Sequence, residues 1–137
     1  MFAQKAAEIL DADMEELIDH SRWTGIDGFF RRARRAIKRG TTELDATRND
    51  PKNYNKIVVL SPIWASTITP AVRTYLKDHN TSIRELNLIV MGGFSDDPSI
   101  SKEEVESMGF KLNGILGLLE KNKSDNLMKL KEFIEKI

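Results

Sequence analysis

Cysteine is absent from the 137-residue sequence, which excludes disulfide bonds, thiolate metal sites and cysteine nucleophiles. An excess of one charge is also absent, because 21 basic residues balance 21 acidic ones. Such a balance gives no overall attraction to nucleic acid or to an anionic membrane. No apolar run approaches the roughly 20 residues of a membrane-spanning helix, and the first residues lack the pattern of a secretory signal. We therefore expect a cytoplasmic protein.

The sequence does contain enough apolar material for a folded core. Hydrophobic residues make up 40% of the chain and charged residues 31%, proportions that are typical of globular proteins. The length is that of one domain, and a chain of this size buries a core without covalent staples. We expect residues 1–137 to form a single domain.

Apolar runs alternate with segments of helical spacing. Strands are predicted at 56–61, 86–91 and 111–119, with a further strand candidate at 14–19. The runs at 56–61 and 86–91 are apolar on both faces, as a parallel strand covered by helices on both sides requires. Recurrent apolar residues three and four positions apart predict helices at 2–10, 26–39, 70–79, 101–109 and 124–137. The alternation predicts a parallel sheet with right-handed crossovers and helices on both faces.

Two of these helices carry start signals. Thr69 precedes Pro70, a hydroxyl N-cap followed by a proline in the first turn. Ser101 and Glu104 have the spacing of a capping box, and Gly109 is a stop signal.

Two loops that follow predicted strands carry the candidate binding residues. They are "SPIWASTITP" at 61–70 and "MGGFSDDPS" at 91–99, and loops at the carboxyl ends of parallel strands lie at one edge of the sheet. Aromatic rings suit a flat ligand, and paired glycines let the backbone approach its polar edge. This combination predicts a site for a planar cofactor, formed by Ser61, Pro62, Ile63, Trp64, Ala65, Ser66, Thr67, Gly92, Gly93 and Phe94.

The stretch "YNKIVVLSPIWASTITPAVRTYL", followed by "LNLIVMGGF", resembles the flavodoxin family. The resemblance implies a flavodoxin-like three-layer αβα fold. It also implies that the two loops enclose the isoalloxazine ring of FMN, with Trp64 stacked on the ring. The expected function is then electron transfer or FMN-dependent oxidoreduction, in which the cofactor carries the electrons. The redox partner or substrate is not indicated.

The sequence departs from the family pattern at its start. Flavodoxins begin with an apolar strand and a Thr/Ser-rich turn that holds the FMN phosphate, whereas Met1 aligns within the first helix. The resemblance therefore implies an incomplete sheet and weak or lost FMN binding. The apolar run at 57–60 would lack its inner neighbour, and an open apolar edge must be covered. Three explanations are open: a piece of a longer protein, a shift of 14–19 into the gap, or a homodimer.

Other functions are open to the same residues. A flavodoxin-like domain without FMN would act as an interaction or structural module, and a phosphoacceptor receiver domain shares the strand order. Six basic residues between 31 and 39 lie on a predicted amphipathic helix, which we expect to face solvent without specific nucleic-acid binding. Asp96 and Asp97 lack further spaced ligands for a cation. His20 and His79 have no visible catalytic partner, and we expect no metal site.

Overall fold

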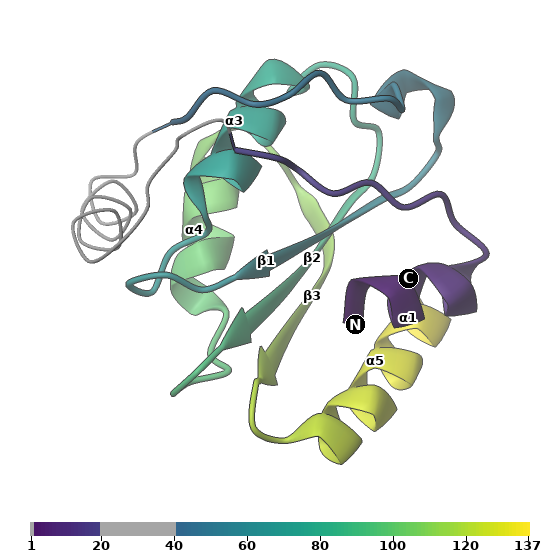
Figure 1. The fold of residues 1–137 in the computed structure, drawn as a ribbon, viewed down its shortest axis with the longest axis vertical. Coiled ribbons are helices and arrows are strands. Elements are labelled where there is room, and N and C mark those ends of the chain that lie inside the picture. Colours follow the sequence, from purple (N-terminus) through teal and green to yellow (C-terminus); the bar gives the residue numbers. More distant parts are fainter. Residues whose placement is uncertain (1, 20–40) are drawn as a thin grey trace.

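The computed structural model describes residues 2–19 and 41–137, which form an α/β fold (Figure 1). Within these residues the sheet has three parallel strands in the order β1-β2-β3. They are β1 (Ile57–Pro62), β2 (Leu86–Gly92) and β3 (Leu112–Leu119). The helices are α1 (Phe2–Leu10), α3 (Pro70–Asp78), α4 (Ser99–Ser107) and α5 (Lys123–Lys136), and a 3₁₀ turn, η1, spans Pro51–Asn53.

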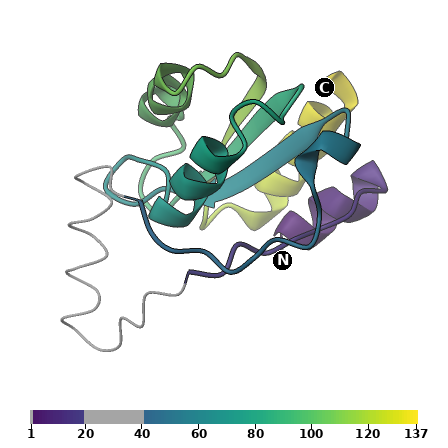
Figure 2. The same ribbon diagram turned by 90° about the horizontal axis from the view of Figure 1, so that it is seen from above.

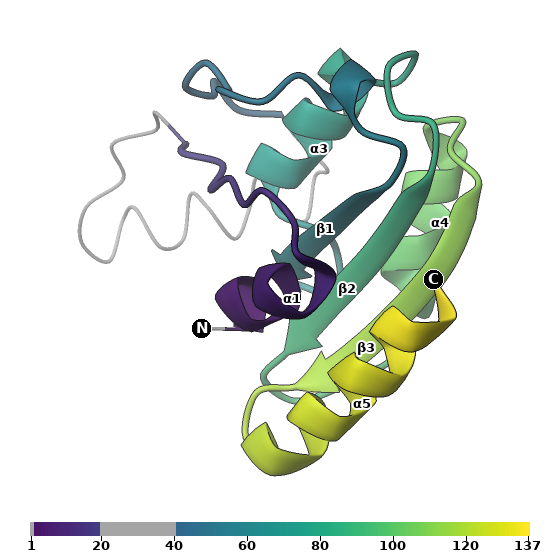
Figure 3. The same cartoon turned by 90° about the vertical axis from the view of Figure 1, so that its right-hand side faces the viewer.

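The helices cover both faces of the sheet. Figure 3 shows α1 and α5 together on one face and α3 and α4 on the other. Because side chains alternate along a strand, β2 contributes Leu88 and Val90 to the α3–α4 side and Ile89 to the α1–α5 side. All three side chains are fully buried. The predicted three-layer architecture is thus confirmed, and the centre of the core lies around β2.

The three apolar runs that predicted strands form β1, β2 and β3. No strand end differs from its predicted position by more than one residue. Thr69 is the N-cap of α3, and its side chain accepts a hydrogen bond from the backbone N–H of Val72, as predicted. The predicted helix at 26–39 and His20 lie outside the described residues. No helix within 2–19 and 41–137 is long and apolar enough to cross a membrane.

The strand prediction for residues 14–19 was wrong. The segment forms a single bridge, between Asp19 and Leu44, and does not join the sheet. The Glu15 carboxylate accepts the backbone N–H groups of Arg48 and Asn49 instead. Pairing with β1 would place such carboxylates inside the sheet, where an unpaired charge is costly. The segment therefore packs against the polar residues at 48 and 49 instead.

The start of α4 also differs from its prediction. The helix begins at Ser99, and the Asp97 carboxylate accepts the Ser99 backbone N–H at 3.0 Å. Ser101 is therefore inside the helix and is buried, and its hydroxyl has no hydrogen-bond partner among the described residues. Glu104 is also buried, and it contacts α3 rather than the first turn of its own helix. A capping-box spacing within a helix is therefore not a start signal.

Candidate functional site

The carboxyl ends of β1 and β2 bring the two predicted loops together. The Ile63 backbone N–H donates to the Met91 carbonyl at 2.8 Å, just after the last paired residues of the two strands. The side chain of Ile63 also lies beside the backbone of Gly92. The loop at 63–69 and the loop at 93–98 are therefore neighbours at one edge of the sheet, as the sequence predicted.

The loop at 63–69 contains a tight two-residue turn. Trp64 and Thr67 exchange two backbone hydrogen bonds, of 2.9 and 3.0 Å, around Ala65 and Ser66. Both central residues have positive φ, 49° for Ala65 and 65° for Ser66. This conformation is unusual for residues with a side chain, and it is the one that a type I′ turn requires. Ala65 and Ser66 are exposed at the tip of the turn.

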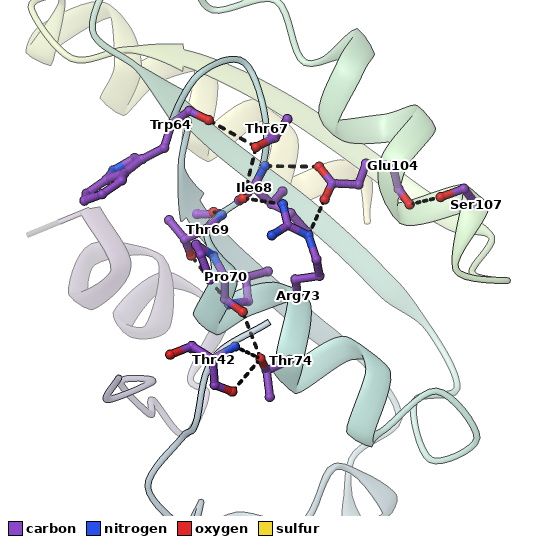
Figure 4. A network of polar contacts seen from close by, with 12 residues as sticks. Thr42, Trp64, Thr67, Ile68, Thr69, Pro70, Arg73, Thr74, Glu104 and Ser107 are labelled. Atoms are coloured by element: carbon purple, nitrogen blue, oxygen red, sulfur yellow. Dashed lines mark hydrogen bonds and ion pairs between the residues drawn. The ribbon is translucent and has the colours of Figure 1, made fainter. Parts of the chain in front are cut away.

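A buried ion pair fastens this loop to the two helices beneath it (Figure 4). Arg73 of α3 and Glu104 of α4 pair at 2.5 Å, with only 1% and 2% of their side chains exposed. The guanidinium also donates to the Ile68 carbonyl at 3.0 Å, and Glu104 accepts the Ile68 backbone N–H at 3.4 Å. Backbone groups of the loop thus supply a further hydrogen bond to each of the two buried charges. A buried charge needs such partners, so the loop conformation is fixed.

The hydroxyls of this loop hold its own backbone. Ser61 is fully buried, and its hydroxyl donates to the Pro62 carbonyl and accepts the Thr69 backbone N–H. Thr67 is buried too, and its hydroxyl donates to the Trp64 carbonyl at 3.1 Å. The structure therefore places Ser61 and Thr67 behind the loop surface, and Pro62, Ala65 and Ser66 on it.

Trp64 is partly exposed, as expected for a residue at the rim of the sheet. Figure 4 shows its ring pointing away from Arg73 and Glu104. The ring reaches a large cavity that also touches Pro62 and Thr69. Because the backbone of its loop is fixed, Trp64 presents a preformed apolar surface.

The second loop, at 93–98, is exposed throughout most of its length. A side chain at Gly92 would lie 1.9 Å from the Ser95 carbonyl oxygen, so this glycine is required by the path of its own loop. A side chain at Gly93 would meet only the Glu120 carboxylate, at 3.9 Å, and Phe94 is completely exposed, at 103%. An aromatic ring without packing partners is available to a ligand. The Asp97 carboxylate is held by the Ser99 hydroxyl and backbone N–H, and these two bonds lower the pKa of Asp97.

The residues of this edge fit a flat, uncharged ring better than a phosphate. Trp64 and Phe94 supply apolar surface, and Gly93 supplies accessible backbone. Neither 61–70 nor 91–98 contains a lysine or an arginine. Lys129 reaches Asp96 at 3.5 Å, but Asp125 holds it as well, at 3.2 Å. Across 2–19 and 41–137, no group of three or more histidine, aspartate or glutamate side chains could hold a metal ion.

No known family model matches the chain, and no curated protein has significant sequence similarity to it. Solved structures do match. A flavoprotein from Lactobacillus acidophilus in complex with FMN aligns with a TM-score of 0.67 and 16% identity, over 92% of this chain and 90% of that one. A candidate flavoprotein from Bacteroides eggerthii aligns with a TM-score of 0.75 and 14% identity, over 96% and 87% of the two chains. A candidate flavoprotein from Bacteroides uniformis gives 0.68 and 17%, over 98% and 90%. At these identities the likeness concerns the fold alone, and the chain has the flavodoxin-like α/β fold of these flavoproteins.

Proposed function

We propose that this protein is a flavodoxin-like FMN-binding protein that works in electron transfer or FMN-dependent oxidoreduction. One observation carries the proposal: Trp64 and the fully exposed Phe94 lie on neighbouring loops at the carboxyl edge of the sheet. In open α/β sheets this edge is where ligands bind. The shared fold with a flavoprotein crystallised with FMN supports the choice of ligand.

The protein would position the flavin ring and shield it from water. FMN, when bound, supplies the redox chemistry. Trp64 would cover one side of the ring, since its loop is held in place by Arg73 and Glu104. Phe94 and the backbone of Gly93 would cover the other side, and both are accessible. Neither loop places a histidine or a lysine at the edge, so the proposed role of the chain involves no proton transfer by such a side chain.

The phosphate would add little to binding at this edge, because no cation of either loop faces it. A charge-assisted hydrogen bond contributes about 1.5–3 kcal/mol, so a phosphate site with two or three of them tightens binding by several powers of ten. We therefore propose weak FMN binding, with riboflavin and FMN affinities within about threefold of each other.

The proposal is tested by titrating the protein into riboflavin and into FMN, with the quenching of flavin fluorescence as the measure of binding. Stacking on an aromatic ring contributes about 0.5–1.5 kcal/mol, so Trp64→Ala and Phe94→Ala should each weaken binding about 2- to 12-fold. Met128→Ala is the matched control, because Met128 is an exposed apolar residue on α5, with 56% of its surface accessible. Affinity that is unchanged in both aromatic variants would place the ring elsewhere.

An interaction module without FMN remains the other candidate from the sequence. It requires that neither flavin binds at millimolar concentration, and the same titration decides this. The flavoprotein neighbours favour the first proposal.

A further inference from the structure

The start of β3 contains the only Asn-Gly pair of the sequence, Asn113-Gly114. Figures 1 and 2 show β3 at the end of the three-stranded sheet, beside β2 and away from β1. Leu112 pairs with Leu86 of β2, and the register then shifts. The next residue of β2, Asn87, pairs with Gly114. Asn113 is thus an extra residue in β3, as in a β-bulge, and no residue of β2 lies opposite it.

The side-chain amide of Asn113 bridges two acceptors. Its Nδ2 donates to the Glu85 carboxylate and to the Asn87 side-chain oxygen, each at 3.2 Å. Asn87 is fully buried, whereas Asn113 is exposed. The Glu85 carboxylate also lies 3.9 Å from the Lys56 ammonium group, which offsets its charge. Position 113 therefore requires a neutral side chain that donates hydrogen bonds.

Packing requires glycine at the next position. A side chain at Gly114 would begin 2.9 Å from the Asn87 side-chain oxygen and 3.0 Å from the Phe133 ring. A methyl carbon of Ile137 would be nearer still, at 2.8 Å. A close-packed interior has no room for such an addition. The fold therefore places an amide at 113 and glycine at 114 for separate reasons.

An asparagine that precedes glycine is open to an intramolecular reaction. The backbone nitrogen of Gly114 attacks the side-chain carbonyl carbon of Asn113, and the new C–N bond closes a five-membered imide. The attacking nitrogen gives up its proton, and Nδ2 leaves as ammonia. Water then opens the imide at either carbonyl and yields aspartate or isoaspartate. Most residues hinder the attack with their Cβ, which glycine lacks.

The location of the pair lowers the free energy of the opening that this reaction needs. The imide forms only when the backbone at 113 leaves its place in the sheet. Asn113 is the second residue of β3, and β3 has a single neighbouring strand among the described residues. Strand ends and bulges open at lower free energy than strand centres. No other asparagine of the sequence precedes a glycine.

Conversion would replace a hydrogen-bond donor by an acceptor. The new carboxylate would face the Glu85 carboxylate and the Asn87 side-chain oxygen, both of which now accept from the Asn113 amide. The Lys56 ammonium group would then offset two carboxylates, which repel each other. Isoaspartate would also add one carbon to the backbone within the strand. Either product therefore opposes the pairing of β2 with the start of β3.

We propose that Asn113 is a site of spontaneous deamidation and that its conversion weakens the pairing of β2 and β3. The modification consumes only water and releases ammonia, so it needs no enzyme or cofactor. The release of ammonia makes it irreversible, and it therefore limits the lifetime of the folded protein. The inference does not depend on flavin binding.

Incubation of the intact protein at mildly alkaline pH tests the chemistry, with peptide mapping by mass spectrometry as the readout. We expect Asn113 to convert at least about tenfold faster than any other asparagine, because glycine does not hinder the attack. Asn122 is the internal comparison, since it is also exposed but precedes Lys123. The same protein unfolded in urea shows the rate of conversion without the sheet. Asn113→Gln should abolish the reaction, because its longer side chain would have to close a six-membered imide.

The Asn113→Asp variant measures the consequence of conversion directly. We expect its Tm to fall by about 4–10 °C, because two hydrogen bonds are lost and a charge is added beside Glu85. Asn113→Ala removes the same hydrogen bonds without adding a charge, so it should lower the Tm less. Asn122→Asp is the matched control, because it adds a charge where the side chain makes no cap hydrogen bond. Its Tm should stay within about 2 °C of that of the unmodified protein.

Either of two results would overturn the proposal. One is the failure of Asn113 to convert first in the folded protein, under conditions in which the unfolded protein converts at this position. The other is an Asn113→Asp variant that is no less stable than the Asn113→Ala variant. Earliest conversion at Asn113, together with the larger loss of Tm in the aspartate variant, supports the proposal.

Discussion

The two loops at the carboxyl edge of the sheet are built in opposite ways. The loop at 63–69 is tied to α3 and α4 by the buried Arg73–Glu104 pair, and two of its residues adopt positive φ. The loop at 93–98 has no comparable anchor among the described residues, and its aromatic residue, Phe94, is fully exposed. Both loops follow adjacent strands of one sheet, so the difference comes from what lies beneath each loop.

The proposed flavin site would therefore have one fixed wall and one adaptable wall. A fixed surface such as that of Trp64 lowers the cost of ordering side chains when a ligand binds. An exposed loop has few buried contacts to lose, so it rearranges at small cost. The comparison therefore predicts that substitutions below the first loop affect folding strongly, and that most substitutions in the second loop do not.

The largest effect is expected at the anchor of the first loop. Glu104→Ala leaves the Arg73 charge buried without its partner, and we expect a loss of about 3–5 kcal/mol in the free energy of unfolding. Replacing both residues with leucine should recover most of this loss, because no buried charge remains. Urea denaturation monitored by circular dichroism measures both variants.

Glu106→Ala on the same helix is the matched control. Glu106 pairs with Lys102 at 3.8 Å on the surface, where both side chains are more than 40% exposed. Such pairs contribute about 0–1 kcal/mol. A Glu104→Ala variant no less stable than the Glu106→Ala variant would contradict a fixed first loop.

An intermediate effect is expected at the start of the second loop. Gly92→Ala places a methyl group 1.9 Å from the Ser95 carbonyl oxygen, so the backbone must move. Overpacking of this kind costs about 1–3 kcal/mol, and thermal denaturation measures it. At Gly93 the nearest atom is 3.9 Å from the added methyl group. Gly93→Ala should therefore stay within about 0.5 kcal/mol, as exposed substitutions do. Equal losses in the two variants would contradict this account.

The smallest effect concerns pH. Hydrogen bonds from the Ser99 hydroxyl and backbone N–H lower the pKa of Asp97 below its ordinary value of 3.8. A carboxylate with a lowered pKa in the folded state stabilises α4 at any pH above that ordinary value. The contribution fades as pH falls through the folded pKa. An NMR titration should show the Asp97 carboxyl titrating below 3.8, and Ser99→Ala should move it upward. An unchanged titration in the variant would rule out the hydroxyl as a cause.

Most of the fold was predictable because its signals are local. The strands β1 and β2 are apolar and rich in β-branched residues, and Thr69-Pro70 marks the start of α3 through contacts within a single turn. The ends of neighbouring parallel strands share one edge, so the neighbouring positions of the loops at 63–69 and 93–98 followed from topology. The sequence could not show that Ser61 and Thr67 face the loop interior, because their partners are backbone groups of a turn that had not been predicted.

The sequence by itself determined the order of strands and helices, the apolar faces of the elements and the composition of the two loops. Hydrophobic periodicity and turn chemistry are properties of neighbouring residues, so they can be recognised in the sequence. Only the tertiary structure decided that Glu104 pairs with Arg73 and that residues 14–19 stay outside the sheet. It also decided that a cavity of about 1210 Å³ remains beside β1. These outcomes depend on which buried charges are paired when segments distant in the sequence pack together. No local sequence pattern indicates the free energy of such pairing.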